Sequence, residues 1–425
     1  MKFADFPQAV VNENVEYAVK EITNVIKKYG PRESGGENCY AAQKHIKKEL
    51  DSFCDETHFE SYKMSPKALV HFTKIVSAAI IIAVALCSIL TFKGIMTFFL
   101  SQCIVAGVIA VSLFVTLMQF VLYKEFLDPL YKKVEAHNLI GVRKPRGEVK
   151  RRIIISGHID AAYEWRHIYF GKDSPLMLGL MYGTIGGAVI SLILAVITIV
   201  ANFVDMGKFG DFMLNYSFYF NFFTALMMIT LFLFVDFKTI SPGANDNLTG
   251  TYAAVTALRM LDMAGVDFEN TEVCAMITDG EEAGLRGCKA WARDHYDEYV
   301  NGGVETAILC VDTLTDYEYM NVYKKDMSGM VDNSKALSEL VMEAGKEAGC
   351  DDIKLATVFF GSSDAAAFSQ AGITATTLAA MDPHPADYYH NRRDTADRLV
   401  PKTIKAGFNT VIATILKFDE QGLQK

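Results

Sequence analysis

The sequence predicts an α/β fold with a mostly parallel central sheet flanked by helices and four inserted transmembrane helices. Apolar, strand-like runs alternate with amphipathic helical segments through most of the chain, which is the pattern of parallel strands joined by crossover helices. Polar and acidic residues follow directly after several of these runs, where α/β folds place their chemistry. Two long apolar blocks interrupt the alternation, and they account for the predicted transmembrane helices.

The composition excludes several classes of protein. The chain has 425 residues, of which 51% are hydrophobic, and a formal net charge of −9, which argues against nucleic acid as a partner. Its eight cysteines form no C-x-x-C pair. We therefore expect neither a zinc finger nor a disulfide framework, and a reducing compartment is favoured. The first residues contain no apolar run of the kind found in secretory signal peptides, so none is expected.

Four runs without any charged residue define the apolar blocks: 75–92, 95–123, 174–204 and 212–235. A helix needs roughly 20 apolar residues to cross a bilayer, so the runs predict two transmembrane hairpins. A buried helical core is the alternative, which the length and adjacency of the runs disfavour. We expect one soluble domain, formed by residues 1–67, 125–173 and 238–425. The two hairpins are expected at residues 68–124 and 174–237.

The soluble segments contain recognisable elements in order. Hydrophobic spacing predicts helices at 15–28 and 38–54, separated by the break Tyr29–Gly36, and a strand at 57–62. Later strands are expected at 151–157, 273–278, 306–311 and 373–378. One helix is expected to run to about Met263, and Asp246 and Asn247 are suited to its N-cap. Further helices are expected at 285–295, 334–349, 362–371 and 401–418.

Histidine and acidic residues stand where these strands end. The adjacent acids Glu281 and Glu282 follow the 273–278 strand, and two neighbouring side chains rarely face the same way. One can therefore bind a metal while the other takes a proton from water, which is what metal-assisted hydrolysis needs. Two imidazoles and three carboxylates form a ligand set for two zinc-like ions that share one carboxylate: His158, Asp246, Glu282, Asp312 and His390. Taken singly, each has a plainer interpretation as a solvated turn, a helix cap or a structural histidine.

The order and flanks of these residues resemble the family 28 metallopeptidases, which include bacterial di-zinc aminopeptidases, glutamate carboxypeptidase and glutaminyl cyclase. The matching segments are Gly-His-Ile-Asp (157–160), Gly-Ala-Asn-Asp-Asn-Leu-Thr-Gly (243–250), Asp-Gly-Glu-Glu-Ala-Gly-Leu-Arg-Gly (279–287), Gly-Ser-Ser-Asp-Ala-Ala-Ala-Phe (361–368) and Tyr-His-Asn-Arg-Arg-Asp-Thr-Ala-Asp (389–397). The resemblance covers about residues 15–62 and 135–420, with the apolar blocks as insertions.

The resemblance implies a zinc exopeptidase fold that holds two Zn²⁺, although other divalent ions are compatible with the ligands. It implies that His158 and Asp312 bind one ion, Glu282 and His390 the other, and that Asp246 bridges them. It further implies that Asp160 orients His158, and that Glu281 is the general base for peptide hydrolysis by metal-bound hydroxide. The pocket candidates are Ser363 and Asp364 from the matching segment, and His384, for which ordinary loop chemistry is the favoured interpretation.

Among family activities, an aminopeptidase is favoured. A carboxypeptidase, a glutaminyl-cyclase-like acyltransferase that uses one metal, and a non-catalytic receptor-like relative are the alternatives. Retention of all five ligand positions favours a two-metal enzyme over the last two. A transporter is disfavoured, because the four apolar runs carry no internal charge to mark an ion path.

Lysine and arginine residues are unevenly distributed about the hairpins. Two lie in the connectors, Lys93 and Lys208, and ten lie on the soluble-domain side: Lys63, Lys67, Lys74, Lys124, Lys132, Lys133, Arg143, Arg166, Lys172 and Lys238. The positive-inside rule therefore predicts an integral protein of the cell membrane with a cytoplasmic catalytic domain. Only 14 residues separate Asp160 from Ser174, so the metal site is expected within about 40 Å of the bilayer. The expected partners are the lipid bilayer and a peptide substrate. One hypothesis is that the substrates are membrane-derived peptides; the alternative is that the hairpins only anchor or dimerise the protein. The sequence does not predict the oligomeric state.

Overall fold

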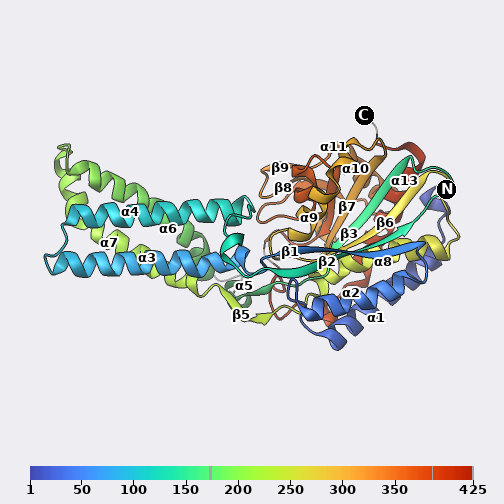
Figure 1. Cartoon of the computed structure of the whole chain (residues 1–425), viewed down its shortest axis with the longest axis horizontal. Helices are drawn as coiled ribbons and strands as arrows, with labels where there is room; N and C mark the ends of the chain where they lie inside the picture. The colour runs from blue at the N-terminus through green and yellow to red at the C-terminus, as the bar shows by residue number, and fades with distance from the viewer. Residues whose placement is uncertain (172–174, 385, 424–425) are drawn as a thin grey trace. The chain divides into compact units, whose positions relative to one another are not determined.

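A computed structural model describes residues 1–171, 175–384 and 386–423, without the side chains of 176–178 and 180–182. The predicted boundary at Ser174 lies outside these residues. The chain forms two compact units, each built from segments distant in the sequence (Figure 1). The sheet unit comprises Met1–Pro66, Lys132–Tyr163 and Lys238–Lys425, and the helical unit comprises Lys67–Tyr131 and Glu164–Phe237.

The sheet unit contains a nine-stranded mixed sheet of order β1-β2-β6-β3-β7-β11-β8-β10, with β9 paired to β8. Its strands are β1 (Glu56–Met64), β2 (Val134–Arg143), β3 (Arg151–His158), β6 (Thr271–Thr278), β7 (Glu305–Leu314), β8 (Met320–Asp326), β9 (Val331–Asp332), β10 (Lys354–Thr357) and β11 (Ala375–Ala380). The central strands β6, β3, β7 and β11 are parallel, and β8 and β10 also pair in parallel. The pairs β1–β2, β2–β6, β11–β8 and β8–β9 are antiparallel. The α/β prediction with a mostly parallel centre is confirmed.

Helices cover both faces of this sheet. The unit contains α1 (Gln8–Tyr29), α2 (Glu37–Leu50), α8 (Thr249–Met263), α9 (Arg286–Asp294), α10 (Tyr296–Asn301), α11 (Lys335–Glu347), α12 (Ala365–Gln370) and α13 (Pro401–Gln421). Helices α1, α2, α8 and α13 share one buried core with the first face. Helices α9 and α12 pack on the other face, where the rings of Trp291 and Phe368 lie 5.7 Å apart.

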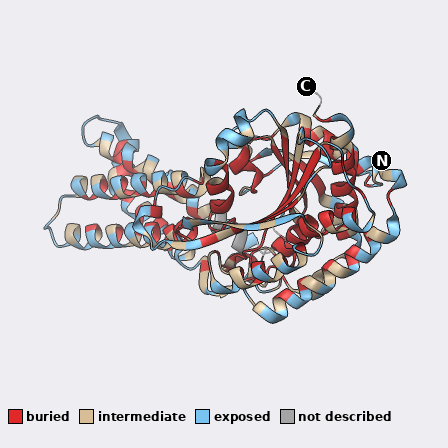
Figure 2. Cartoon of the chain, turned by 45° about the vertical axis from the view of Figure 1, so that its right-hand side comes forward, coloured by how far each residue is buried: buried red, intermediate tan, exposed pale blue. Residues whose placement is uncertain are grey.

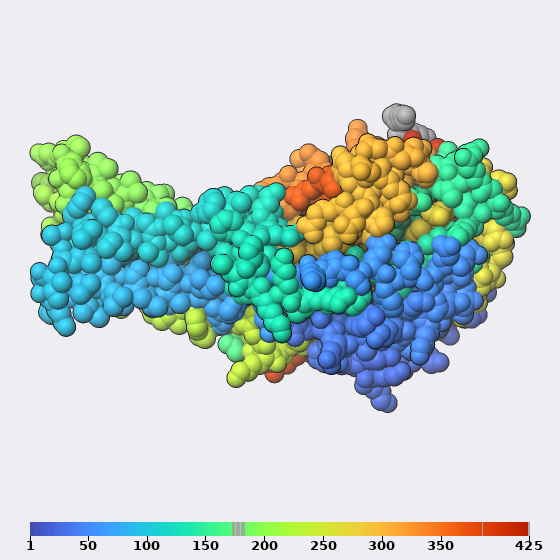
Figure 3. Space-filling model, viewed as in Figure 1, coloured from blue at the N-terminus to red at the C-terminus, as the bar shows by residue number. Residues whose placement is uncertain are grey.

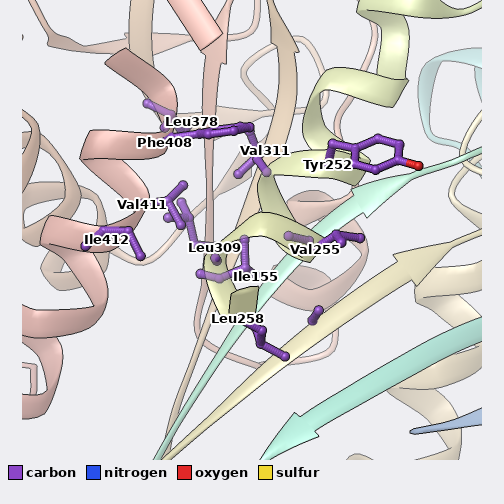
Figure 4. Close-up of a cluster of buried hydrophobic side chains, with 14 of the residues drawn as sticks. Ile155, Tyr252, Val255, Leu258, Leu309, Val311, Leu378, Phe408, Val411 and Ile412 are labelled. Carbon is purple, nitrogen blue, oxygen red and sulfur yellow. The ribbon is translucent and has the colours of Figure 1, made fainter. Parts of the chain in front are cut away.

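The main core forms because the central strands are apolar on both faces. In β3, Ile153 and Ile155 point toward the helices of the first face, while Ile154 is buried on the second. Figure 4 shows side chains of β3 and β7 meeting those of α8 and α13, among them Ile155, Leu309, Val311, Val255, Leu258, Phe408 and Val411. This packing fixes the strands whose ends carry the candidate ligands.

Several strands escape sequence-based prediction because they lack a continuous apolar run. The outer strands β2, β8 and β10 contain charged or polar residues, such as Glu135 and Asn138 in β2. The short strands β4 (Tyr163–Trp165) and β5 (Val235–Ile240) pair only with each other. Helix α8 begins at Thr249, so Asp246 and Asn247 precede it with non-helical backbone angles instead of capping it directly.

The helical unit contains α3 (Ala68–Phe92), α4 (Phe98–Thr116), α6 (Pro175–Ala201), α7 (Gly207–Phe232) and the short α5 (Arg166–Gly171). Among the described residues, four spans are long and apolar enough to cross a membrane: Ala68–Phe92, Phe98–Val121, Gly183–Ala201 and Gly207–Phe232. Helices α3 and α4 lie side by side in Figure 3, and α3 also packs against α7. The outward faces of these helices are exposed in Figure 2 and carry large apolar side chains, including Phe92, Ile190 and Phe222.

The interior of the helical unit contains neutral hydrogen-bonding side chains. Asn221 Nδ2 of α7 donates to Gln102 Oε1 of α4 over 2.9 Å, and Thr184 of α6 lies 3.1 Å from Thr230 of α7. The buried polar side chains that the structure describes within these four helices are all uncharged. Such interhelical hydrogen bonds are typical of helices that pack in an apolar medium.

Candidate metal centre

The candidate ligands gather at one edge of the sheet because parallel strands end there together. His158 is the last residue of β3, Asp312 lies near the end of β7, and Glu282 follows β6. The first turn of α8, which follows Asp246 closely in the sequence, approaches β3 so closely that a Cβ at Gly157 would lie 2.3 Å from the Gly250 carbonyl carbon. Glycine at position 157 is therefore required for this turn to reach the strand end.

Two groups of ligand atoms form at this edge, each with all its atoms within 4.8 Å of one another. One consists of His158, Asp246 and Asp312, and the other of Asp246, Glu282 and His390. Asp246 belongs to both groups: its Oδ1 lies 3.4 Å from His158 Nε2 and its Oδ2 lies 3.3 Å from His390 Nε2. The structure thus brings together all five residues that the sequence suggested as ligands.

The outer carboxylates complete the two groups. Asp312 Oδ1 lies 4.0 Å from His158 Nε2, and Glu282 Oε1 lies 3.4 Å from His390 Nε2. Glu282 Oε1 is buried and accepts no hydrogen bond from the part of the chain that the structure describes. A buried carboxylate oxygen without a donor, beside imidazole nitrogens and further carboxylates, fits a bound divalent ion such as zinc.

The charges at this edge are unbalanced. Burial raises the pKa of Glu282 and of Asp312, the latter to about 7, and the negative charge of Asp246 adds to both shifts. Burial alone would raise the pKa of Asp246 as well, but the hydrogen bonds from His158 and His390 lower it. Carboxylates that repel one another in a buried site favour a cation, because the cation removes both the repulsion and the desolvation penalty.

Residues 232–415 match the sequence profile of peptidase family M28. The matched range contains Asp246, Glu282, Asp312 and His390, whereas His158 and Asp160 precede it. A search of curated proteins finds no match to the chain.

Solved structures of M28-like enzymes share the fold. BSAP, a zinc aminopeptidase from Bacillus subtilis, is 13% identical, with a TM-score of 0.53 over 97% of this chain and 95% of that chain. A glutaminyl cyclase from Fimbriiglobus ruber is 13% identical, with a TM-score of 0.55 over 95% of each chain. The LapA aminopeptidase of Legionella pneumophila is 11% identical, with a TM-score of 0.52 over 98% of this chain and 74% of that chain. The M28 family and these zinc aminopeptidase neighbours support a metallopeptidase-like hydrolase and point to zinc.

Glu281 stands beside the two ligand groups but belongs to neither. Its Oε2 lies 3.9 Å from His158 Nε2, and 11% of its side chain is exposed. Burial raises the pKa of Glu281, and the nearby charges of Asp364 and Asp312 add to the shift against the opposing effect of His158. A carboxylate that holds a proton more tightly than usual, next to a metal site, is suited to acid–base work.

Asp160 contacts both His158 and the acidic turn that carries Glu281 and Glu282. Its backbone carbonyl oxygen lies 3.1 Å from His158 Nδ1, a partner that places the proton on Nδ1 and leaves Nε2 for a metal. Its carboxylate Oδ1 accepts a hydrogen bond from Glu281 N, and its Oδ2 accepts one from Glu282 N, at 3.2 and 3.1 Å. The carboxylate therefore holds the turn that carries the two glutamates.

Asp394 is a supporting residue that the sequence reasoning did not single out. It is fully buried; its Oδ1 accepts hydrogen bonds from the backbone and side-chain nitrogens of Asn245, and its Oδ2 accepts one from Asp246 N. Burial raises the pKa of Asp394 to about 7, and the charge of Asp246 adds to the effect. The available signal was its place in the matching 389–397 segment, four residues after His390, which itself has a left-handed φ of 48°.

The three pocket candidates lie in different surroundings. Asp364 is buried near the end of β6, where its Oδ2 accepts a hydrogen bond from Thr278 Oγ1 over 2.8 Å. The Ser363 hydroxyl is buried and hydrogen-bonded to Asp326 and Thr377. The structure does not bring His384 to the candidate ligands. Its side chain is 90% exposed, and its Nδ1 lies 3.3 Å from Asp382 Oδ1.

A separate histidine–glutamate group joins α1 to α2. His45 Nε2 lies 3.5 Å from Glu21 and 3.1 Å from Glu49. His45 is half-buried in these ion pairs. Ion pairing between the two helices accounts for this arrangement.

Proposed function

We propose that this chain is a membrane-anchored di-zinc exopeptidase, and specifically an aminopeptidase. The observation that carries the proposal is the position of Asp246, whose two carboxylate oxygens face the imidazole nitrogens of His158 and His390. A carboxylate shared between two such groups is the arrangement expected of a two-metal hydrolase.

The residues divide into two ligand sets. His158, Asp246 and Asp312 would hold one zinc, and Asp246, Glu282 and His390 would hold the other. When bound, zinc supplies a Lewis acid that polarises the scissile carbonyl and makes water a stronger acid. Three ligands per ion leave room for water and substrate, as in other catalytic zinc sites.

Glu281 would carry the proton during hydrolysis. Its carboxylate accepts a proton from the attacking water and later donates it to the nitrogen of the leaving amine. Burial raises the pKa of Glu281, which favours uptake of the proton from water and keeps it on the carboxyl group until the leaving amine accepts it. Asp160 assists by holding the backbone of Glu281 and Glu282 through its two carboxylate oxygens.

Acyl transfer of the glutaminyl cyclase type is the second candidate, because a solved cyclase and a zinc aminopeptidase resemble this fold to a similar degree. The two chemistries differ in their products. An aminopeptidase releases an amino acid from any accepted free amino terminus, whereas a cyclase releases ammonia from an N-terminal glutamine. The two ligand groups around Asp246 support the aminopeptidase.

The test uses the purified full-length protein. We would measure its metal content and its turnover of peptides with free amino termini, acetylated amino termini, free carboxyl termini and N-terminal glutamine. Two zincs per chain and release of N-terminal residues from free amino termini alone are expected. Cyclised product without hydrolysis would favour the cyclase, and the absence of bound metal and of turnover would refute the enzyme proposal.

Membrane anchoring and orientation form the second part of the proposal. The four long apolar spans support anchoring, and the excess of Lys and Arg outside the connectors supports a cytoplasmic sheet unit. We would introduce Lys93→Cys, Lys208→Cys and, in the sheet unit, Lys354→Cys. A membrane-impermeant maleimide should label the first two in intact cells and the third only after permeabilisation, with the parent protein giving the background from its own cysteines. The reverse pattern would invert the orientation.

The substrate proposal is that the enzyme trims peptides released at the membrane. It rests on the short chain segments that connect the second hairpin to Asp160 and Asp246. Preferential cleavage of bilayer-bound peptides over the same sequences in solution would support it. Equal rates would leave anchoring as the role of the hairpins.

A further inference from the structure

The segment Gly30–Gly36, here called the Arg32 turn, connects α1 to α2 and contributes none of the candidate ligands. The sequence suggested only that it breaks the chain. In the structure, it makes hydrogen bonds to three other turns, each of which carries or adjoins residues of the metal centre. The Arg32 turn is therefore bonded to the turns that carry or adjoin the candidate ligands.

Arg32 joins the end of β3 to the turn before α8. It is fully buried, and its Nε donates to the carbonyl oxygen of Ile159, the residue between His158 and Asp160, over 2.7 Å. Its Nη2 donates to the carbonyl oxygen of Gly243, three residues before Asp246, and its Nη1 to that of Pro242, both over 2.9 Å. The planar guanidinium group has its donors at fixed angles, so it sets the spacing between the two backbones it joins.

The contact at Gly243 leaves no space for a side chain. Gly243 has a φ of +64°, and a Cβ there would lie 2.6 Å from Arg32 Nη2 and 2.8 Å from Ala161 Cβ. The backbone of the Arg32 turn is tied to the same place, because Ala161 N donates to the Arg32 carbonyl oxygen over 2.9 Å. The turn before α8 is thus pressed directly against the guanidinium group.

Ser34 acts on the acidic turn through Asp160. It is buried, and its hydroxyl donates to Asp160 Oδ2 over 2.6 Å. The same oxygen accepts the hydrogen bond from Glu282 N, and Asp160 Oδ1 accepts the one from Glu281 N. Next to Ser34, Gly35 N donates to the carboxylate of Asp279, two residues before Glu281, over 3.1 Å.

We propose that the Arg32 turn is a positioning element of the metal centre: Arg32 sets the separation of His158 from Asp246, and Ser34 fixes the Asp160 carboxylate that holds Glu281 and Glu282. The inference rests on the proposed function, because it assumes that these ligands bind zinc. A purely structural tie would change the stability of the sheet unit and leave the affinity and coordination of the metal unchanged. A positioning element changes both metal properties.

The test is Ser34→Ala in the full-length protein, with Ser338→Ala as the matched control. Ser338 lies on α11 and is buried, as Ser34 is. Its hydroxyl donates to the backbone carbonyl oxygen of Ser334, the N-cap residue of that helix. The readouts are zinc affinity by competition with a chelator and the visible absorption spectrum of the cobalt-substituted protein. We expect roughly tenfold weaker zinc binding and an altered cobalt spectrum for Ser34→Ala, as for other residues that support metal ligands. Ser338→Ala should lower thermal stability alone.

Two further variants keep the test decisive if Ser34→Ala folds poorly. Ser34→Thr retains the hydroxyl and should restore both metal readouts, whereas Arg32→Lys replaces the fork by a single ammonium group and should weaken zinc binding. Wild-type affinity and an unchanged spectrum in both Ser34→Ala and Arg32→Lys would overturn the proposal. Failure of the wild-type protein to bind zinc would instead refute the proposed function, so the two failures are distinguishable.

Discussion

The sheet unit and the helical unit both bury polar side chains, but these differ in charge. In the helical unit the described buried polar groups of the four long helices are neutral: Asn221 and Gln102 bond each other, whereas the buried hydroxyls of Ser77 and Ser217 have no hydrogen-bond partner among the described residues. In the metal centre of the sheet unit, carboxylates outnumber the imidazoles that could neutralise them, and Glu282 has a buried oxygen that accepts no hydrogen bond from the described part of the chain.

The difference shows which unit needs a counter-charge. Buried neutral groups leave no net charge to compensate, so the interior of the helical unit is consistent with a structural role. A buried excess of negative charge carries a desolvation penalty that only a proton or a cation removes. Chemistry is therefore expected in the sheet unit alone, and the two units should respond differently to metal, to pH and to the loss of single polar groups.

The largest expected effect is on turnover. Glu281→Gln removes the proposed proton acceptor while leaving both ligand groups intact, so kcat should fall by roughly 10²–10⁴ with the zinc content unchanged. Glu49→Gln, which alters a largely buried glutamate of α2 outside the metal centre, is the control and should retain activity. Steady-state kinetics with metal analysis on the same samples decides, and undiminished turnover in Glu281→Gln would remove this residue from the mechanism.

The second effect is on metal binding. Asp246→Asn removes the carboxylate common to both ligand groups, so the affinity for both zincs should fall by more than roughly 100-fold. Asp262→Asn, near the end of α8, where the side chain is 49% exposed and paired with Arg143, should bind zinc normally. Titration calorimetry of the metal-free proteins measures the difference. Loss of only one zinc in Asp246→Asn would show that the two ions do not share this ligand.

The third effect is on the pH dependence of stability, and it separates Glu49 from the metal centre. Burial raises the pKa of Glu49 from 4.5 to about 7. The groups that face it are Tyr17 and Glu21 of α1, His45 of α2, and Tyr252 and Arg259 of α8. The folded state holds the proton more tightly than the unfolded state does, so this contribution is fully present below pH 4.5 and is lost as the pH rises to about 7.

Glu49→Gln should therefore remove a decrease of roughly 2–3 kcal/mol in the free energy of unfolding between pH 4.5 and 7. Denaturant unfolding at several pH values, with and without zinc, measures it. The part due to Glu49 should persist when zinc is bound, whereas the pH dependence due to the ligand carboxylates should change with zinc. Identical pH profiles for the variant and the wild type would contradict the assignment.

The smallest effect is expected in the helical unit. Asn221→Leu leaves Gln102 without its interhelical partner and should lower the stability of the helical unit by roughly 0.6–1.7 kcal/mol. Phe222→Leu, at a neighbouring position that is 60% exposed, is the control. Unfolding in detergent provides the measurement, and zinc affinity should be unchanged in both variants. An effect of Asn221→Leu on zinc affinity would show that the two units are energetically coupled.

The strands of the sheet centre and the long helices were predictable because each carries an uninterrupted apolar or periodic pattern. Strand β3, with three successive isoleucines, is an example, and so is α3. The ligands could be proposed because they stand in short motifs at strand ends. Strands β2, β8 and β10 could not be predicted, since polar residues interrupt their apolar pattern and each pairs with a strand distant in the sequence.

The supporting residues of the metal centre were also hidden from the sequence. Arg32 precedes Asp246 by more than 200 residues, and only the folded chain shows that its guanidinium group lies on the Gly243 carbonyl. Asp394 is similar, since a charged residue in a polar loop gives no sign that it will be fully buried against Asn245. Spacing reveals residues that do chemistry more readily than residues that hold them in place.

The pairing of β3 with β6 has a consequence for biosynthesis. These strands lie in register from Arg151 with Thr271 to His158 with Thr278, and helices α6 and α7 are encoded between them. A ribosome therefore releases β3 before the second hairpin exists and β6 only after that hairpin has been completed. On the proposed membrane anchoring, the central sheet would be assembled last, on a chain already tethered to the bilayer, and the proposed zinc centre would form only after that step.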